Sequence, residues 1–186
     1  VGADAWQFRV KNQTPHCKFG EMGVCCRICS MGPCRITPKA PRGICGCDVH
    51  GIVGRNFLRF TAGGAATHSD HGREICITLG YAKEGGDYQV KDPEKLIRIA
   101  KEWGVETEGK DIYDLAHEMS DLAQEEYGKI RGVSRWLKRA PQHTQDLWHA
   151  AGIEPRAIDR EVSCALHMTH MGNTSKPEAL IRQALR

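Results

Sequence analysis

The 186-residue sequence has no long hydrophobic run, and aromatic residues make up only 6% of it. No stretch approaches the roughly 20 consecutive apolar residues that a membrane-spanning helix needs, so we expect no membrane span. The N-terminal VGADAWQFRV also lacks the apolar core of a secretory signal peptide. We therefore expect the protein to reside in the cytoplasm.

An excess of charge of either sign is also absent. The chain has 26 Lys and Arg against 23 Asp and Glu, a formal net charge of +3 at pH 7. Proteins that bind nucleic acid typically gather Lys and Arg on one face, so this even balance argues against nucleic acid as a partner. Hydrophobic residues at 40% and charged residues at 26% indicate a globular chain with a core of its own.

The sequence lacks segments that alternate with the period of a β-strand, and it lacks internal repeats. From Asp48 onward, capping residues and prolines open helices and glycines end them. These signals predict helices over 48–80, 92–104, 111–130, 142–152, 155–172 and from 177 onward. We predict an all-α fold, a helical bundle over 49–186 that follows an irregular cysteine-rich segment over 1–48. The small run AGGAAT (62–67) is expected to let another backbone approach closely.

Nine cysteines are placed unevenly along the chain: seven lie between Cys17 and Cys47, and Cys76 and Cys164 stand alone. A secreted disulfide scaffold is typically shorter and spreads its cysteines more evenly. A tight cluster in a chain without an export signal favours metal binding. We expect Cys76 and Cys164 to be small buried side chains.

Three cysteines of the cluster, Cys26, Cys29 and Cys34, follow the pattern C-x2-C-x4-C, and Cys45 comes eleven positions later. Three close thiolates and a remote fourth are typical of a chain that wraps a four-iron cluster. In the same region five Lys or Arg stand against one acidic residue, which favours thiolates. A zinc ribbon uses the same ligand type but is expected to have two C-x2-C knuckles, so iron–sulfur is preferred over zinc.

Cys25 directly precedes Cys26. Neighbouring residues of an extended chain point to opposite sides, so we expect Cys25 to face a second site, with Cys17 as its partner. Two thiolates do not complete a four-iron cluster, but a symmetric dimer would supply another pair across its twofold axis. A zinc site completed by His16 and a pair of spare thiols are the alternatives at this point.

Longer phrases of the sequence resemble a known family. The stretch HCKFGEMGVCCRICSMGPCRITPKAPRGICG, followed by TAGGAATHSDHGREI, is similar to the N-terminal helical domain of nickel-containing carbon monoxide dehydrogenase, including the form paired with acetyl-CoA synthase. The phrases GPCRI, GICG and HSDHGR are together very specific, and IEPRAIDREV and LHMTHMG also resemble that family. The resemblance covers most of the chain, with residues 82–150 the least diagnostic.

The resemblance implies two sets of cluster ligands. The ligands of an internal [4Fe-4S] cluster would be Cys26, Cys29, Cys34 and Cys45. A second cluster, shared at the interface of a homodimer, would take Cys17 and Cys25 from each subunit. Cys47 follows the GICG phrase and is the other candidate for the fourth internal ligand; we favour Cys45 because the phrase around it matches.

The resemblance also implies the reaction. The family oxidises CO with water to CO2, two protons and two electrons, and its clusters carry electrons from a buried nickel–iron–sulfur site to ferredoxin-like proteins. In the family the nickel–iron ligands lie in later α/β domains, which these 186 residues do not contain. We therefore expect that this chain alone does not oxidise CO. It would be a fragment of the enzyme, a separately encoded electron-transfer piece or a decayed relative.

Two histidines, His68 and His71, lie three residues apart in THSDHGRE and share one helix face. The family resemblance implies that they begin a histidine ladder that moves protons beside the active site, a task that suits a side chain titrating near neutrality. The next positions at this spacing are Glu74 and Ile77, so the ladder is short.

The sequence therefore favours the electron-relay portion of a nickel carbon monoxide dehydrogenase that acts as a homodimer, with a ferredoxin-like acceptor and acetyl-CoA synthase as the implied partners. A stand-alone ferredoxin-like iron–sulfur carrier is the first alternative. A zinc-stabilised interaction module is the second.

Overall fold

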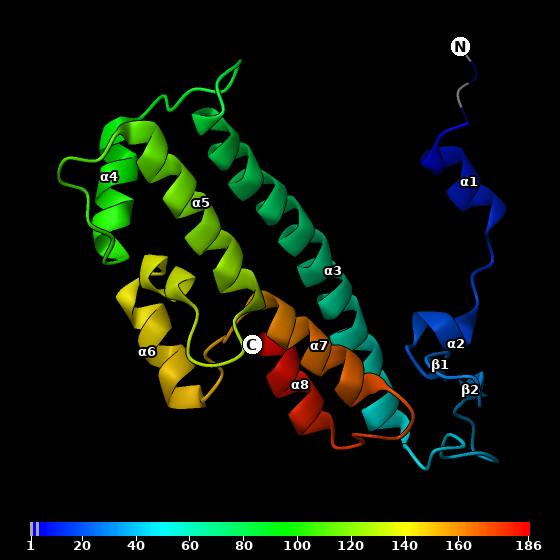
Figure 1. The fold of residues 1–186 in the computed structure, drawn as a ribbon. Helices are drawn as coiled ribbons and strands as arrows, with labels where there is room; N and C mark the ends of the chain where they lie inside the picture. The colour runs from blue at the N-terminus through cyan, green and yellow to red at the C-terminus, as the bar shows by residue number, and fades with distance from the viewer. Residues whose placement is uncertain (1, 3) are drawn as a thin grey trace. The chain divides into compact units, whose positions relative to one another are not determined.

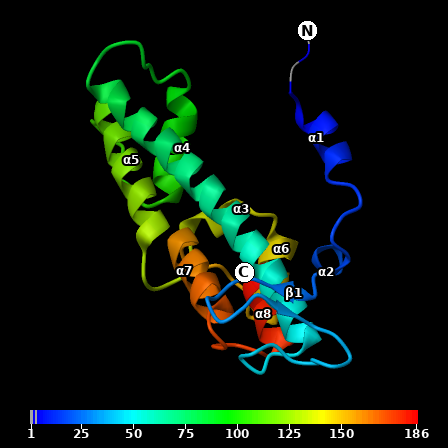
Figure 2. The same cartoon turned by 90° about the vertical axis from the view of Figure 1, so that its right-hand side faces the viewer.

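The computed structural model describes residues 2 and 4–186, most of which are helical (Figures 1 and 2). Two short helices, α1 (Trp6–Asn12) and α2 (Lys18–Glu21), precede an antiparallel pair of two-residue strands, β1 (Cys25–Cys26) and β2 (Cys34–Arg35). The remaining elements are α3 (Val49–Gly80), the 3₁₀ helix η1 (Tyr81–Lys83), α4 (Pro93–Glu102), α5 (Ile112–Gly128), the 3₁₀ helix η2 (Arg135–Arg139), α6 (Gln142–Ala151), α7 (Ile158–Thr169) and α8 (Pro177–Leu185). The prediction of a mostly helical chain with a cysteine-rich N-terminal region is confirmed.

The capping residues that the sequence predicts begin their helices. The Asp92 carboxylate accepts a hydrogen bond from the backbone N–H of Lys95 at 3.0 Å, with Pro93 as the first helical residue. Asp111 accepts from the backbone N–H of Tyr113 at 2.8 Å. Such caps satisfy backbone N–H groups that have no partner inside the helix. None of the helices of residues 2 and 4–186 has the length and apolarity needed to cross a lipid bilayer.

One predicted helix start is wrong. The sequence signal at Pro155 predicts a helix from that residue, whereas α7 begins at Ile158. The backbone N–H of Arg156 donates to the Glu161 side chain at 3.0 Å. Residues 155–157 therefore lead into the helix and do not form its first turn.

The chain divides into two compact units, which we describe separately. The first comprises Val1–Leu58 and His167–Ile181, and the second comprises Arg59–Leu166 and Arg182–Arg186. The division after residue 48 was predicted from a change in amino-acid composition, and it stays a prediction.

The first unit has a small core in which cysteine side chains take part. Cys26, Cys47 and Ile52 are buried against one another. A side chain at Gly51 would collide with the Cys47 sulfur and would lie 2.7 Å from the carbonyl oxygen of Ser175. The absence of a side chain at Gly51 therefore lets both segments pack against the start of α3.

The second unit is built around α5, which packs against both α4 and the later part of α3 (Figures 1 and 2). Apolar side chains of α5 face the core, with Leu115 and Met119 both buried. The hydroxyl of Ser120 donates to the carbonyl oxygen of Cys76 at 2.7 Å and ties α5 to α3. These contacts bury the residues that the helical periodicity marks as apolar.

Glycines along α3 differ in their surroundings. A side chain at Gly72 would collide with the Tyr127 hydroxyl, and one at Gly80 would lie 2.9 Å from the hydroxyl oxygen of Ser120. At Gly63 and Gly64, no heavy atom of the described residues outside the neighbouring helix backbone lies within 4 Å of such a side chain. Within this structure other segments therefore approach α3 closely at Gly51, Gly72 and Gly80, not at the AGGAAT run where we expected it.

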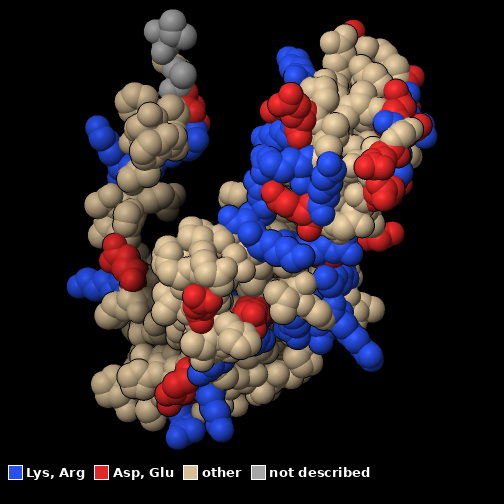
Figure 3. Space-filling view, turned by 90° about the vertical axis from the view of Figure 1, so that its left-hand side faces the viewer, with Lys and Arg blue, Asp and Glu red and all other residues tan. Residues whose placement is uncertain are grey.

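Basic and acidic side chains are interspersed on the face shown in Figure 3. Glu126 pairs with Lys129 and Arg135, each at 3.2 Å, and Glu102 pairs with Arg139 at 2.9 Å. The basic residues around η2 are thus partly neutralised by carboxylates of α4 and α5.

Candidate metal centre

Four cysteine side chains line one small hollow in the first unit. They are Cys26, Cys29, Cys34 and Cys45. The apolar side chains that line the same hollow are Ile28, Met31, Ile44, Ile52 and Met171. The structure thus brings the four candidate ligands of the internal cluster to one place, inside a largely apolar wall.

The short sheet places two of these cysteines opposite each other. Cys26 of β1 pairs with Cys34 of β2 in antiparallel register. Between the strands, a side chain at Gly32 would lie 3.0 Å from the backbone nitrogen of Cys34 and 3.2 Å from the carbonyl oxygen of Cys26. Such crowding favours glycine at the turn that carries the chain from one ligand to the next.

The adjacent cysteines lie in an extended strand, so their side chains point to opposite sides. Cys26 is buried and lines the hollow, whereas Cys25 is half-buried and is not among the residues that line it. The Asn56 amide of α3 donates to the carbonyl oxygens of Gly23 and Cys25, at 2.9 and 3.0 Å, and anchors this strand. Cys17, the expected partner of Cys25, is exposed just before α2.

Hydrogen-bond donors point at two of the candidate ligand sulfurs. Nη1 of Arg55 donates to Sγ of Cys45 at 3.3 Å, and the backbone N–H of Ile44 donates to Sγ of Cys34 at 3.5 Å. Burial is the largest single influence and raises the pKa of the Cys45 thiol, but the hydrogen bond and charge of Arg55 and the backbone N–H groups of Cys47 and Cys45 together outweigh it, so the pKa lies below its ordinary value. These donors stabilise negative charge on sulfur.

Cys47 lies in a different environment from Cys45. Its side chain is completely buried and packs against Cys26 and Ile52, and it does not line the hollow. Burial raises the pKa of the Cys47 thiol. The geometry therefore favours Cys45 as the fourth donor at this hollow.

The donor set suits an iron–sulfur cluster. Among residues 2 and 4–186, no three or more His, Cys, Asp or Glu side chains lie close enough together to hold a single metal ion. A four-iron cluster is a larger body that its four thiolates surround. Thiols from the short sheet and its following loop, N–H donors to sulfur and an apolar wall are the features that hold and tune such a cluster.

Comparison with known proteins agrees with this chemistry. Residues 24–186 match the model of a family described as Prismane/CO dehydrogenase. The chain belongs to the Prismane/CO dehydrogenase family. It is 43% identical to carbon monoxide dehydrogenase 1 of Methanosarcina mazei over 187 aligned positions, which cover 98% of this chain and 30% of that protein.

Solved structures of Prismane/CO dehydrogenase family enzymes share the fold. A carbon monoxide dehydrogenase from Thermococcus sp. AM4 has a TM-score of 0.91 and 41% identity, covering 98% of this chain and 30% of that one. An acetyl-CoA synthase/carbon monoxide dehydrogenase with NiZn[Fe4S4] and NiNi[Fe4S4] clusters in its alpha subunits has a TM-score of 0.87 and 35% identity, covering 95% of this chain and 27% of that one. The chain thus spans about 30% of the length of the carbon monoxide dehydrogenases that it matches.

The other residues predicted from the sequence lie outside the hollow. His68 and His71, predicted from the CO dehydrogenase resemblance as a proton path, are both exposed on α3. Cys76 is buried in the core of the second unit, as predicted. Cys164 is only half-buried, and its sulfur accepts a hydrogen bond from Nη2 of Arg156 at 3.4 Å, so it is not a simple apolar core residue.

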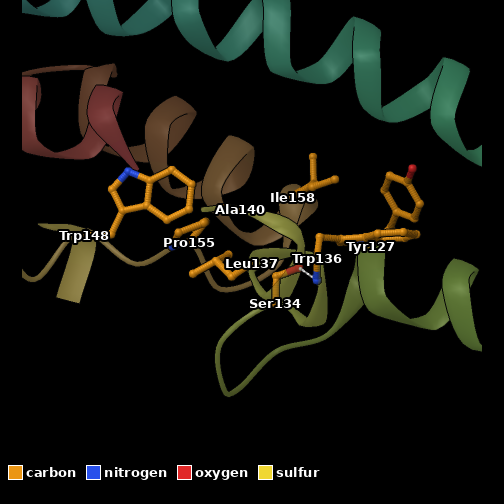
Figure 4. Close-up of a pocket in the computed structure, with 8 residues that line it drawn as sticks. All are labelled: Tyr127, Ser134, Trp136, Leu137, Ala140, Trp148, Pro155 and Ile158. Carbon is orange, nitrogen blue, oxygen red and sulfur yellow. Dashed lines mark hydrogen bonds between the residues drawn. The ribbon is translucent and has the colours of Figure 1, made fainter. Parts of the chain in front are cut away.

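A second hollow, of about 280 Å³, lies in the second unit (Figure 4). Its lining residues are Tyr127, Ser134, Trp136, Leu137, Ala140, Trp148, Pro155 and Ile158. None of these is a cysteine or a histidine, and none was predicted as a site residue of the CO dehydrogenase family. The hollow is a mainly aromatic and aliphatic surface without metal-binding groups.

Two residues beside the candidate ligands were not predicted from the sequence. Arg55 and Asn56 are consecutive polar residues in the otherwise apolar stretch GIVGRNFL of α3. The five basic residues from which thiolates were predicted lie between Cys17 and Cys47, whereas Arg55 lies beyond them. A charged residue within the apolar first turns of a long helix is the signal that points to such a role.

Proposed function

We propose that this chain is the electron-relay portion of a nickel carbon monoxide dehydrogenase, which converts CO and water to CO2, two protons and two electrons. The observation that carries the proposal is the single hollow lined by four cysteines in the first unit. Membership of the Prismane/CO dehydrogenase family supports the reaction.

In this proposal the internal [4Fe-4S] cluster is held by Cys26, Cys29, Cys34 and Cys45. Such a cluster supplies reversible one-electron transfer when bound. The chain positions the thiolates through the pairing of β1 with β2. Solvent exposure is one of the factors that set the potential of a cluster, and it differs among these ligands, since Cys26 is buried and Cys45 is exposed.

Cys17 and Cys25 are proposed as the ligands of a second [4Fe-4S] cluster, shared with the same pair of a second copy in a homodimer. Their accessibility supports this role, because Cys17 is exposed and Cys25 is half-buried. A ligand shared across a twofold axis has to be reachable from the neighbouring subunit.

The nickel–iron–sulfur site belongs, in this proposal, to the part of the enzyme that the chain does not cover, since the chain matches only about 30% of its relatives' length. A ferredoxin-like protein is the proposed acceptor of the electrons. Acetyl-CoA synthase is a proposed further partner, supported by the likeness to an acetyl-CoA synthase/carbon monoxide dehydrogenase.

His68 and His71 enter the proposal as the first groups of a proton path. Both side chains are exposed on α3, and the side chain of Glu74, one turn further on, is exposed as well. Glu74 is able to carry one further proton step, whereas Ile77 cannot accept a proton. The path along this helix is therefore short.

Reversible electron transfer by the isolated chain tests the proposal. The chain is purified without oxygen, reduced with dithionite, desalted and mixed with an oxidised ferredoxin, beside a Cys26→Ser variant. We expect a dimer that passes electrons to the ferredoxin, and a variant that passes fewer of them, because it retains only the shared cluster. A monomer that transfers electrons would instead support a stand-alone carrier, and a chain with zinc and no reversible reduction would contradict the redox function.

A further inference from the structure

Arg55 is an unusual residue for the interior of a small unit. Its side chain is 2% exposed, although arginine is almost never fully buried unless it is paired. Among the described residues, its guanidinium donates hydrogen bonds to the sulfur of Cys45 and the carbonyl oxygen of Thr174. Neither partner is a carboxylate. A negative charge at the Cys45 sulfur would therefore offset the cost of burying this cation.

The guanidinium is held in place from two directions. Nε and Nη2 donate to the carbonyl oxygen of Thr174 at 2.9 and 2.8 Å, which leaves Nη1 directed at Sγ of Cys45, 3.3 Å away. Gly172, with φ of +72°, brings the same segment against Cys45, where an added side chain would lie 3.1 Å from Cβ of Cys45. Residues 172–174 therefore support both the donor and the acceptor of this hydrogen bond.

We propose that Arg55 is a positioning residue that holds Cys45 as a cluster ligand and raises the reduction potential of the internal cluster by donating to the Cys45 sulfur. The inference rests on the proposed function, which places a [4Fe-4S] cluster at this hollow. One-electron reduction adds a negative charge to a cluster. A hydrogen bond and a positive charge at a ligand sulfur favour that reduced form and so make the potential less negative.

The test compares three substitutions, each combined with Cys17→Ser so that the internal cluster is measured alone. Arg55→Gln removes the charge and the forked donor, and Arg55→Lys keeps the charge with a different geometry. Arg42→Gln is the matched control, because Nη1 of Arg42 donates to the carbonyl oxygen of Gly46 at 3.1 Å in the same loop and not to a sulfur. Iron, sulfide, helical circular dichroism and the potential from an EPR-monitored redox titration are measured for each protein.

We expect Arg55→Gln to shift the potential to a more negative value. At a solution potential that half-reduces the parent, the ratio of reduced to oxidised cluster should fall about tenfold, which is a shift of about 59 mV for a one-electron couple. Arg55→Lys should shift less, and Arg42→Gln should remain close to the parent. Loss of the internal cluster in Arg55→Gln, with unchanged helix content and with iron retained in Arg55→Lys, would equally support the positioning role.

Two results would overturn this inference without affecting the proposed function. The first is an Arg55→Gln protein that keeps four irons and has the same reduction potential as the Arg42→Gln control. The second is an equal loss of helix content and iron in both Arg55 variants. In either case a parent chain that carries iron and sulfide leaves the proposed function standing. A parent chain without iron and sulfide would overturn both.

Discussion

At the scale of single residues, Cys45 and Cys47 differ although only one residue separates them. Residues two apart in an extended chain face the same side, but Gly46 between them has a φ of +84° and turns the backbone. Cys45 is therefore left at the hollow beside Arg55, while Cys47 is buried in the core. The left-handed backbone conformation of Gly46 thus directs the candidate ligand Cys45 and the core residue Cys47 into different environments.

This difference predicts opposite outcomes for two matched substitutions. Cys45→Ala should remove the internal cluster and lower the iron content by about four per chain, with Cys17 and Cys25 unaffected. Cys47→Ala should keep the iron but reduce the free energy of unfolding by about 1 kcal/mol, because it removes a buried sulfur from the core. Iron analysis and denaturant unfolding of the anaerobically purified proteins distinguish the two. Retained iron in Cys45→Ala together with lost iron in Cys47→Ala would assign the ligand to Cys47.

At the scale of elements, the glycines of α3 differ in whether a neighbouring segment packs against them. Gly72 makes room for the Tyr127 hydroxyl of α5, whereas at Gly63 nothing among the described residues crowds an added side chain. The Tyr127 ring is buried, and the Arg73 guanidinium lies 5.1 Å from its centroid. The ring therefore has little freedom to move away.

Alanine at these two positions should change stability in opposite directions. Gly63→Ala should raise the free energy of unfolding by about 0.5–1 kcal/mol, the usual gain when alanine replaces glycine inside a helix. Gly72→Ala should lower it by about 1–3 kcal/mol, because overpacking displaces Tyr127. Urea unfolding followed by circular dichroism measures both changes. A gain at both positions would mean that α3 and α5 do not pack closely at Gly72.

Helix boundaries were largely predictable from the sequence because their causes are local. Asp92 and Asp111 cap the turns that follow them within a few residues. The hydrogen bond from Arg55 to Thr174 spans 119 positions, and no local pattern encodes it. The choice of Gly72 over the AGGAAT run as the place of close approach likewise depends on where α5 packs.

The candidate ligands were predictable for the same reason, because their spacing in the sequence is short. Cys25 and Cys26 are neighbours in an extended strand, so their side chains point to opposite sides. The side chain that donates to the Cys45 sulfur was not predictable, because Arg55 lies in a helix ten positions further along the chain. The sequence therefore indicates the candidate ligands, and the structure adds the N–H groups that donate to two of their sulfurs.

At the scale of the whole molecule, the chain matches about 30% of the length of the carbon monoxide dehydrogenases related to it. The described residues bring four cysteine thiols to one hollow, with N–H groups that donate to two of the sulfurs. We propose that each chain holds one four-iron cluster of its own and half of another that it shares with a second copy.

Counting iron, sulfide and zinc per polypeptide after purification without oxygen tests this claim most directly. One complete four-iron cluster and half of a shared one predict about six irons per chain, falling to about four in Cys17→Ser. About four irons in the unmodified chain would contradict the shared cluster. Zinc without sulfide would contradict the electron relay itself.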